Sequence, residues 1–595
     1  MVLRESPFPN ACIHDLHTAA WALIFPCFWS LDHMVASFKP TTYEEQQKQE
    51  QECYIWPMKV FFRFLMYLIL LVISIPLALV GFIIWAPLQQ VRRPFSFSHV
   101  KTPKVYTQEE WMGYGDGKGF SFVEANLCFL PNCLARFNNL SQTQRRAVQI
   151  AGHISDSVNR PRIQVCMDSP SMTASLQGSP LTAVRQVSYS ATGTQGSVLA
   201  VNNLHHIDSS EENSEVENVH EYLDECQSNK DPLDLTVVEE SNMSSAMDEM
   251  QANQSSKQQA LSSSSLKCQG KPQKKQNRKD DLPAGISPVF PADVAFVCLL
   301  EVFEKRAAAK LKQLLQPAFG HILYDVGVYG FQGCCEFKFF NSGIFLASRY
   351  PIIDAKFHCF PRIRGEDGLA AKGLLCVKIQ VGLTEKGQKI VGYLSCTHLH
   401  AIAEDCHIRQ SQLSHMIVWI NDFQSTSRSE EEKVVFDVLC GDFNFDNCSL
   451  DQLEQQHQIL QIYKDPCCSG PGREKPGVIG TLLQQRTMYE DPVKSPESLQ
   501  RALEIEELRK QYLEFPVNPA VNSTEPRSVG GGRRIDYLLY REDTVAKGVI
   551  TELEEFTFIT QLAGLTDHLP IGMRLFISMV PEEDDDASHD LDDEL

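Results

Sequence analysis

Two long apolar stretches stand near the start of the chain. Residues 64–88 carry no charged side chain over 25 positions, enough for a helix to cross the hydrocarbon core of a bilayer. Residues 11–38 are interrupted by two aspartates, and their uncharged centre, residues 18–31, is only fourteen positions long. A centre of that length fits an interfacial or re-entrant helix better than a spanning one. The pattern predicts that residues 1–115 form a membrane-associated region.

Charged side chains around the second stretch leave its path through the bilayer open. Lys59 and Arg63 precede it and Arg92 and Arg93 follow it, whereas a single spanning helix normally has its basic residues on one side. Positive charge on both sides therefore fits a segment that enters and leaves by the cytosolic face. An ordinary spanning helix is nearly as compatible, and Pro76 allows a kink or a hairpin.

Beyond residue 115 the pattern changes to short apolar runs that alternate with amphipathic stretches. A first strand is predicted at residues 119–130 and a helix at residues 141–158. Strands and helices that interleave over some 300 residues are typical of one layered α/β domain. Further strands are predicted at residues 295–300, 343–347, 374–381, 389–396, 434–439 and 535–539, and helices at 303–315 and 410–422.

A polar segment divides this α/β domain. Residues 167–282 are rich in Ser, Gln, Asn, Asp and Glu and poor in aromatic residues, a composition that cannot bury enough apolar surface to fold. We therefore expect a disordered insert between a first part of the α/β domain, residues 116–166, and its main part, residues 283–580. Residues 581–595 contain nine acidic residues and no Lys or Arg, which predicts a solvated acidic tail.

Overall charge and cysteine content narrow the class of protein. The chain has 54 Lys and Arg against 75 Asp and Glu residues, a formal net charge of -21. Such an excess of acidic residues disfavours a nucleic-acid partner, because binding to nucleic acid needs cations that neutralise phosphates. The 19 cysteines are scattered and form no paired metal-binding motif, which indicates reduced thiols that face the cytosol.

Polar side chains with catalytic potential stand at the ends of several predicted strands. In open α/β sheets, catalytic groups gather at strand ends, so these residues are expected to meet at one site. Taken one by one, each also has an ordinary structural explanation, such as a satisfied core histidine or a helix start. The candidates are Asn126, Glu301, His398, Asp442, Asn444, Asp536, Asp567 and His568.

Six short motifs around these residues resemble those of the endonuclease/exonuclease/phosphatase superfamily, in the same order. Residues 1–10, 21–26, 40–43 and 324–330 also resemble the vertebrate membrane-bound neutral sphingomyelinases. One departure is Leu300, where the superfamily commonly has Gln. The motifs are Ala125-Asn126, Leu300-Glu301-Val302, Thr397-His398-Leu399, Gly441-Asp442-Phe443-Asn444, Arg534-Ile535-Asp536-Tyr537 and Thr566-Asp567-His568-Leu569-Pro570.

The resemblance implies a fold and an activity. The fold is a four-layer DNase I-like α/β sandwich with an N-terminal membrane-associated hydrophobic helical region and a disordered insert. The activity is the Mg²⁺-dependent hydrolysis of sphingomyelin to ceramide and phosphocholine, within sphingolipid metabolism and ceramide signalling, with Mn²⁺ as a substitute metal. The catalytic domain would face the cytosol, at the Golgi membrane and the inner leaflet of the plasma membrane. Homo-oligomerisation is left open.

The same resemblance gives each candidate a role. Glu301 would bind Mg²⁺ with help from Asn126, and His568 would act as the general base whose ring Asp536 orients. The remaining residues would position the reactants: Asp442 and Asn444 would hold water and phosphate, His398 would stabilise the charged transition state, and Asp567 would support the metal or phosphate. His400 is set aside in favour of His398, which directly follows Thr397.

The resemblance also implies regulation. Asp367 and Lys372 match a switch pair that gates the site, although a simple loop ion pair would look the same in the sequence. Arg92 and Arg93 would bind anionic phospholipid, especially phosphatidylserine, and thereby activate the enzyme. Alternatively, they only end the apolar segment. Cys53, Cys334 and Cys335 match palmitoylated positions of the family.

Two other hypotheses fit parts of the sequence. An inositol-phosphate phosphatase or a nuclease would share the fold, but it needs a cationic substrate groove, and the hydrophobic N-terminal region favours a lipid substrate. A membrane scaffold with an inactive catalytic fold would have lost Glu301, Asp442 or His568, and all three are present.

Overall fold

The computed structural model describes most of residues 3–580. The chain divides into two units, residues 1–165 with 278–595 and residues 166–277, and all described residues belong to the first. The predicted insert and acidic tail lie outside the described residues. Described are residues 3–50, 56–100, 117–158, 160, 284–332, 336–361, 363–449, 453–470, 472–515 and 532–580.

Two β-sheets form the centre of the catalytic unit. The larger has the strand order β1 (Ser96–His99), β5 (His321–Tyr324), β8 (Phe345–Ser348), β4 (Val294–Val302), β2 (Lys118–Phe129), β17 (Ile571–Met579), β16 (Val549–Ile559) and β3 (Gly285–Ser287). The smaller has the order β15 (Asp536–Arg541), β12 (Glu432–Asp442), β11 (Lys389–His398), β10 (Gly373–Leu383) and β9 (Ile352–Cys359). β6 (Gly330–Gln332) pairs with β7 (Glu336–Lys338), and β13 (Cys468–Gly470) pairs with β14 (Arg473–Glu474).

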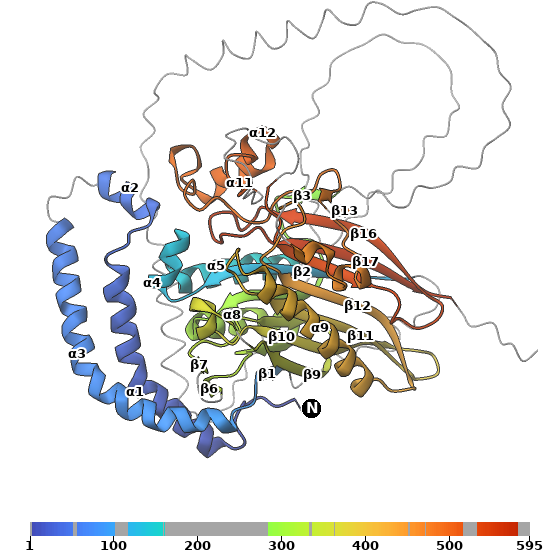
Figure 1. Ribbon diagram of the computed structural model, residues 1–595, viewed down its shortest axis with the longest axis horizontal. Coiled ribbons are helices and arrows are strands. Elements are labelled where there is room, and N and C mark those ends of the chain that lie inside the picture. The colour runs from blue at the N-terminus through green and yellow to red at the C-terminus, as the bar shows by residue number, and fades with distance from the viewer. Residues whose placement is uncertain are drawn as a thin grey trace, which may run out of the picture. The chain divides into compact units, whose positions relative to one another are not determined.

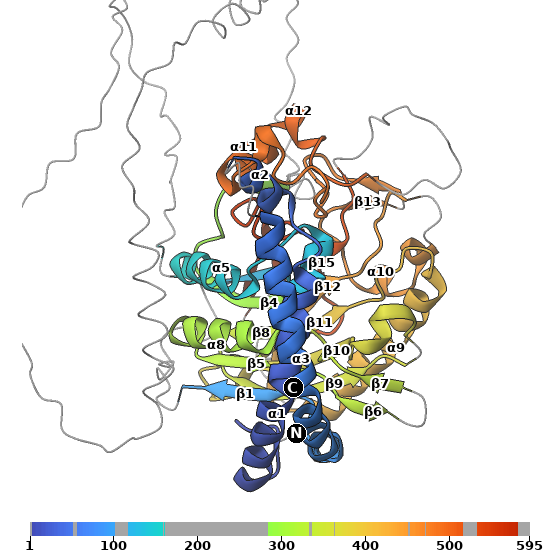
Figure 2. The same cartoon turned by 90° about the vertical axis from the view of Figure 1, so that its left-hand side faces the viewer.

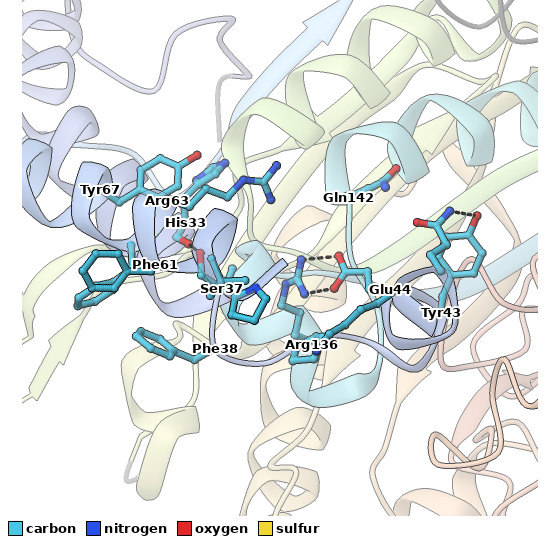
Figure 3. A pocket seen from close by; sticks show the side chains of 17 residues that line it. His33, Ser37, Phe38, Tyr43, Glu44, Phe61, Arg63, Tyr67, Arg136 and Gln142 are labelled. Carbon is cyan, nitrogen blue, oxygen red and sulfur yellow. Dashed lines mark hydrogen bonds and ion pairs between the residues drawn. The ribbon is translucent and has the colours of Figure 1, made fainter. Parts of the chain in front are cut away.

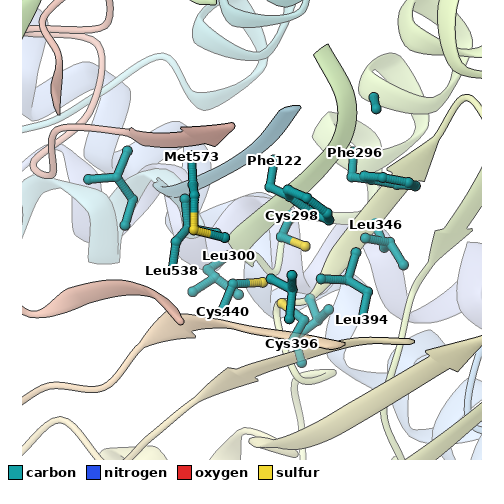
Figure 4. Packing of buried hydrophobic residues seen from close by; sticks show 14 of the residues in the cluster. Phe122, Phe296, Cys298, Leu300, Leu346, Leu394, Cys396, Cys440, Leu538 and Met573 are labelled. Atoms are coloured by element: carbon teal, nitrogen blue, oxygen red, sulfur yellow. The ribbon is translucent and has the colours of Figure 1, made fainter. Parts of the chain in front are cut away.

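The two sheets pack face to face through an apolar core. Phe122 and Phe296 of the larger sheet stack at a centroid distance of 4.9 Å, and they lie close to Phe436 of the smaller sheet. Figure 4 shows Cys298 facing Cys396 and Cys440 across the same interface. Because successive strand residues point to opposite faces, the alternate positions on β2 are free to pack against the helices instead.

Helices cover the outer faces of both sheets. α5 (Thr143–Val158) and α8 (Lys305–Phe319) pack on the larger sheet, and α9 (Cys406–Ser427) packs on the smaller one. Figures 1 and 2 show α5 and α8 on one side of the sheets and α9 on the other. The order helix, sheet, sheet, helix confirms the predicted four-layer α/β sandwich. Shorter helices are α4 (Asn132–Ala135), α10 (Ile459–Ile462), α11 (Pro496–Glu504) and α12 (Glu506–Arg509).

The N-terminal apolar stretches form a helical hairpin. α1 (Ala11–Ala36) and α3 (Trp56–Leu88) run antiparallel, with α2 (Thr42–Glu50) between them, and a 3-10 turn (Gln89–Val91) follows α3. Three contacts set their register: Phe38 with Phe64, Trp29 with Tyr67, and Ala20 with Gly81. A Cβ at Gly81 would lie 2.7 Å from the carbonyl oxygen of Ala20, so glycine permits the close approach of the two helices.

The first stretch differs from its sequence-based description. α1 continues as one helix of 26 residues through Pro26, so both α1 and α3 are long and apolar enough to cross a bilayer by length and composition. Pro26 in α1 and Pro76 and Pro87 in α3 all lie inside their helices. The chain therefore reverses direction between α1 and α3 and not at a proline. Asp32 is buried, and its carboxylate accepts a hydrogen bond from the backbone N–H of Cys133, at 2.7 Å.

Candidate active site

The sheet register brings the predicted strand-end residues together. β2 and β4 are parallel, with Asn126 opposite Leu300, and β11 and β12 are parallel, with His398 opposite Asp442. β15 adds Asp536 directly opposite Asp442 in an antiparallel pair. Parallel strands end at the same edge of a sheet, and the two edges face each other across the core. The side chains from both sheets therefore meet at one site.

Asn126 and Asp442 join the two sheets at this edge. The side-chain amide of Asn126 donates to Oδ2 of Asp442 at 3.0 Å, and its Oδ1 accepts from the backbone N–H of Cys128 at 3.2 Å. The other carboxylate oxygen of Asp442 accepts from the backbone N–H of Asn444 at 2.8 Å. Asn444 has a φ of 55°, and its side-chain amide donates to the carbonyl of Leu399 at 3.1 Å. These bonds fix the orientation of the Asp442 carboxylate.

A buried carboxylate and histidine pair lies next to Asp442. Nδ1 of His568 is 2.8 Å from Oδ2 of Asp536. The hydroxyl of Thr481 accepts from the backbone N–H groups of Ile535 and Asp536, at 3.1 and 3.3 Å, and so holds the start of β15. Burial alone would lower the pKa of His568, but the Asp536 carboxylate raises it well above the ordinary value.

Glu301 stands in a strained backbone conformation at the end of β4. Its φ is 57°, in the left-handed region that a residue with a Cβ rarely adopts. Oε2 is buried and has no hydrogen-bond partner among the described residues. Burial, with the nearby Asp567 carboxylate, raises the pKa of Glu301 to about 7.

Several carboxylate oxygens at the site lack a donor, which fits a cation. Besides Glu301, one oxygen each of Asp536 and Asp567 is buried without a partner in the described part of the chain. Asp442, Asp536 and His568 offer ligand atoms within 4.8 Å of one another. Burial and the Asp536 carboxylate raise the pKa of Asp442 to about 6. A hard divalent cation would relieve this crowding of carboxylates, so the residues present fit a bound metal ion.

His398 is held in its neutral form beside Lys372. Nζ of Lys372 lies 3.1 Å from Nε2 of His398 and 3.0 Å from the carbonyl oxygen of Leu399. Because an ammonium group only donates, Nε2 accepts and the ring proton is on Nδ1. Burial and the Lys372 cation hold the pKa of His398 well below its usual value. Nε2 also lies 3.6 Å from Oδ2 of Asp442, which places the ring at the same site.

Comparison with known proteins identifies the family. Residues 12–91 match the family model described as the neutral sphingomyelinase N-terminal transmembrane region. The chain is 45% identical to sphingomyelin phosphodiesterase 5 of Danio rerio, over 98% of this chain and 100% of that protein. It is 41% identical to sphingomyelin phosphodiesterase 3 of Rattus norvegicus, with the same coverage. The chain belongs to the neutral sphingomyelinase family.

Solved structures similar to this neutral sphingomyelinase family member are more distant. Sphingomyelinase C from Streptomyces griseocarneus is 17% identical, covers 47% of this chain and 86% of its own, and has a TM-score of 0.29. An endonuclease/exonuclease/phosphatase from Beutenbergia cavernae is 15% identical, covers 49% of this chain and 64% of its own, and has a TM-score of 0.30.

The predicted switch pair of this neutral sphingomyelinase relative meets at the site. Oδ1 of Asp367 lies 2.8 Å from Nζ of Lys372, so the pair reaches His398 through the lysine. His400, which the sequence analysis set aside, contacts the other oxygen of Asp367 at 3.2 Å and also Asp405 at 2.8 Å. Burial alone would raise the pKa of Asp367, but the Lys372 cation holds this pKa well below its usual range.

The side chain of Arg92, the expected lipid contact, is packed inside the protein. Its side chain is 3% exposed and forms an ion pair with Asp325 at 2.6 Å. The guanidinium is therefore engaged inside the protein, and an anionic headgroup would have to displace Asp325 to reach it. Arg93 is partly buried, and its backbone N–H donates to Pro7 at 2.7 Å. The predicted palmitoylation sites Cys53, Cys334 and Cys335 lie outside the described residues.

Two supporting residues were missed by the sequence analysis. The amide of Asn138, in the 3-10 turn Arg136–Asn138, donates to Oδ2 of Asp567 at 2.8 Å. Thr481 holds the backbone at Asp536, as described above. Both come from loops far along the chain from their partners, and nothing in their local sequence marks them. Only the folded chain reveals these two contacts.

Proposed function

We propose that the protein is a membrane-bound, Mg²⁺-dependent neutral sphingomyelinase that hydrolyses sphingomyelin to ceramide and phosphocholine. The observation that carries the proposal is the buried Asp536 and His568 pair, 2.8 Å apart, beside carboxylate oxygens that lack a donor. That arrangement is suited to the attack of water on a phosphodiester at a metal centre. The similarity to sphingomyelin phosphodiesterases over nearly the whole chain supports sphingomyelin as the substrate.

Glu301 and Asn126 are the proposed metal-binding residues. Their carbonyl and carboxylate oxygens are the ligands that Mg²⁺ prefers, and Mn²⁺ is the expected substitute. Bound there, Mg²⁺ would neutralise charge on the phosphoryl group and on the leaving oxygen of ceramide. Asp567 supports the same cluster through its free oxygen, while Asn138 holds the other.

His568 is the proposed general base. With Nδ1 engaged by Asp536, its Nε2 takes a proton from the attacking water, and Asp536 stabilises the imidazolium that forms. Asp442 and Asn444 position the water and the phosphate, because their hydrogen bonds leave each side chain a single orientation. His398, whose Nε2 is 3.6 Å from Oδ2 of Asp442, stabilises negative charge that develops on the phosphate.

Asp367 and Lys372 are proposed to gate the site through His398. While Lys372 donates to Nε2, this atom of His398 cannot donate to a phosphate oxygen. Movement of Lys372 away from Nε2 would let this atom carry the ring proton and donate to a phosphate oxygen. Its return would block that hydrogen bond. The contacts of Asp367 with His400 and with the backbone N–H of Ala401, at 3.2 and 2.6 Å, hold the acidic member in place.

Contacts of α2 support a catalytic domain that lies on one side of the membrane together with the whole hairpin. Glu44 accepts paired hydrogen bonds from Arg136 (Figure 3). The backbone N–H of Thr42 donates to the side chain of Asn139 at 2.9 Å. At the other end of the hairpin, Arg92 contacts Asp325. If α1 and α3 crossed the bilayer, α2 would be on the far side and these contacts would break. We therefore favour a hairpin that enters and leaves by the cytosolic face.

The proposed membranes are the Golgi and the inner leaflet of the plasma membrane, where ceramide signalling would follow from the activity. Anionic phospholipid is proposed to activate the enzyme through the hairpin. A cavity of about 870 Å³ beside α2 is lined by Phe38, Phe61 and Arg63, among others (Figure 3). An apolar wall next to a cation suits an acyl chain with an anionic headgroup, which makes this cavity a better candidate than Arg92.

One assay tests the proposed activity. Purified full-length protein is incubated with mixed micelles that contain labelled sphingomyelin, with Mg²⁺, with EDTA, and as the His568→Ala variant. We expect phosphocholine release only from the unaltered protein with Mg²⁺. Metal-independent turnover, or unchanged activity of the variant, would refute the mechanism. Hydrolysis of inositol phosphates without hydrolysis of sphingomyelin would refute the substrate.

A further inference from the structure

Arg92 is tied into the catalytic unit directly after the membrane-associated helices. It follows α3 and its 3-10 turn, and its Nη1 donates to the carbonyls of Arg93 and Gly327, at 3.0 and 2.8 Å. Its Nη2 donates to the carbonyl and the carboxylate of Asp325, at 2.8 and 2.6 Å. The guanidinium also lies over the ring of Tyr329, at 4.7 Å from its centroid. These contacts form a buried anchor between α3 and the loop after β5.

Asp325 connects Arg92 to a second loop, which contains Asn341. Its Oδ1 accepts from the amide of Asn341 at 3.2 Å and from the hydroxyl of Tyr329. Asp325 has a φ of 50°, so its loop conformation needs the surrounding contacts to hold it. Burial alone would raise its pKa, but Arg92 lowers the pKa of Asp325 to about 2. The carboxylate is therefore charged and fixed between Arg92 and Asn341.

The loop that contains Asn341 packs against the backbone at Glu301 and forms hydrogen bonds with its neighbour Val302. Oδ1 of Asn341 accepts from the N–H of Gly343 at 2.9 Å, and the carbonyl of Gly343 accepts from the N–H of Val302 at 2.9 Å. The amide of Asn341 also reaches the carbonyl of Val302, at 3.5 Å. Gly343 lies so near that a Cβ there would be 3.0 Å from Cα of Glu301. These contacts stabilise the left-handed φ of Glu301.

We propose that Arg92 is a positioning residue for Glu301, and that the end of the membrane hairpin is thereby coupled to metal binding. Arg92 holds Asp325, Asp325 holds Asn341, and the loop of residues 341–343 holds the backbone of the metal ligand. The inference rests on the proposed role of Glu301 in binding Mg²⁺. Displacing α3 would remove the anchor and weaken the metal site, and by reciprocity a bound metal would favour the docked hairpin.

The alternative is that Arg92 contacts an anionic headgroup directly. Four donor contacts to protein oxygens and 3% exposure of its side chain argue against that role. If Arg92 instead contacted a headgroup, replacing Asp325 would leave the metal affinity of the protein unchanged. The two roles therefore predict different metal affinities for Arg92 and Asp325 variants in the absence of lipid.

The experiment measures Mn²⁺ affinity of the full-length protein in uncharged detergent micelles, by electron paramagnetic resonance and without substrate. Arg92→Ala and Asp325→Asn should each weaken Mn²⁺ binding about tenfold, the lower range for residues that orient a metal ligand. The double variant should lose no more than either single one, since both break the same link. Lys59→Ala, which removes an exposed cation from the other end of α3, should bind Mn²⁺ like the unaltered protein.

Fold retention is checked by thermal unfolding, and Arg92→Lys serves if Arg92→Ala does not fold. Lysine keeps the charge but cannot make the paired contact with Asp325, so affinity should fall three- to tenfold. Unchanged Mn²⁺ affinity in Arg92→Ala or Arg92→Lys, or additive losses in the double variant, would overturn the coupling alone. Absence of Mn²⁺ and Mg²⁺ binding by the unaltered protein would overturn the proposed function together with it.

Discussion

Nδ1 of His568 and Oδ2 of Asp536 are 2.8 Å apart, although the two residues are positioned by strands of different sheets. Asp536 opens β15 of the smaller sheet, and His568 precedes β17 of the larger one. The hydrogen bond between Asn126 and Asp442 crosses the same interface at 3.0 Å. The candidate site therefore exists only when both sheets are packed together, and its geometry reports on that packing.

Replacing Asp536 with Asn should slow turnover and leave substrate binding nearly unchanged. The amide would stabilise the wrong tautomer of His568 and could not stabilise the imidazolium, so kcat should fall by about 10²- to 10⁴-fold. Phosphocholine release from sphingomyelin micelles gives kcat and KM. Asp422→Asn is the control, because its carboxylate is exposed and pairs with the equally exposed Lys356, at 2.7 Å. A tenfold or smaller loss of kcat would contradict the assigned role.

Glu301→Gln should weaken Mg²⁺ binding at least about tenfold, because it removes a charged ligand from the metal site. In EDTA the same variant should unfold at a higher temperature than the unaltered protein. Burial and Asp567 raise the pKa of Glu301 to about 7, which means that the ionised carboxylate is disfavoured in the folded state. Calorimetry with Mg²⁺ and with EDTA measures both effects. Equal stabilisation of the two proteins by Mg²⁺ would rule out Glu301 as a ligand.

Lys372→Met should destabilise the fold and lower activity. The variant leaves the nearly buried Asp367 carboxylate without its cation, which typically costs about 3–5 kcal/mol. Lys356→Met removes an exposed lysine from its pair with Asp422 and should cost less than about 1 kcal/mol. Urea unfolding compares the two. If both variants lost the same small amount, the Asp367 and Lys372 pair would be an ordinary surface contact.

Gly441→Ala should misplace Asp442 or prevent folding. Gly441 has a φ of 146°, and a Cβ there would lie 1.9 Å from the carbonyl oxygen of Thr397 on the neighbouring strand. Relief of that clash requires the strands to separate, at about 3 kcal/mol or more. In Gly152→Ala a Cβ meets no atom within 4 Å, and the helix should gain up to about 1 kcal/mol. Thermal unfolding of both variants checks the contrast.

Asp325 should make a contribution to stability that disappears in acid. Its pKa is about 2 in the folded protein against an ordinary value of 3.8, so the ionised form is favoured by folding. The contribution is present above pH 4 and is lost as the pH falls toward 2, which corresponds to about 2 kcal/mol in total. The stability difference between unaltered protein and Asp325→Asn should therefore shrink by about 1 kcal/mol between pH 6 and pH 3. A difference that does not change with pH would contradict the ion pair with Arg92.

Much of the fold follows from local patterning. The strand predicted at residues 374–381 lies within β10, and the helix predicted at 410–422 lies within α9, because both have the periodicity of a buried element. β16 was missed, since Glu552, Glu554 and Glu555 interrupt its apolar alternation. The helix predicted at 303–315 begins two residues later, because the side chain of Glu304 accepts from backbone N–H groups and caps it.

The sequence by itself determined the layered α/β domain and the apolar N-terminal helices, since each depends on a local period. The four-layer sandwich followed from the resemblance carried by six short motifs. Tertiary structure decided which polar atoms pair and which are left for a metal. Arg92 shows the difference most clearly. From its position after an apolar helix it looks like a lipid contact, but the fold brings Asp325, 233 positions away, within 2.6 Å of it. A local pattern cannot contain that contact, because only the packing of α3 against the catalytic unit creates it.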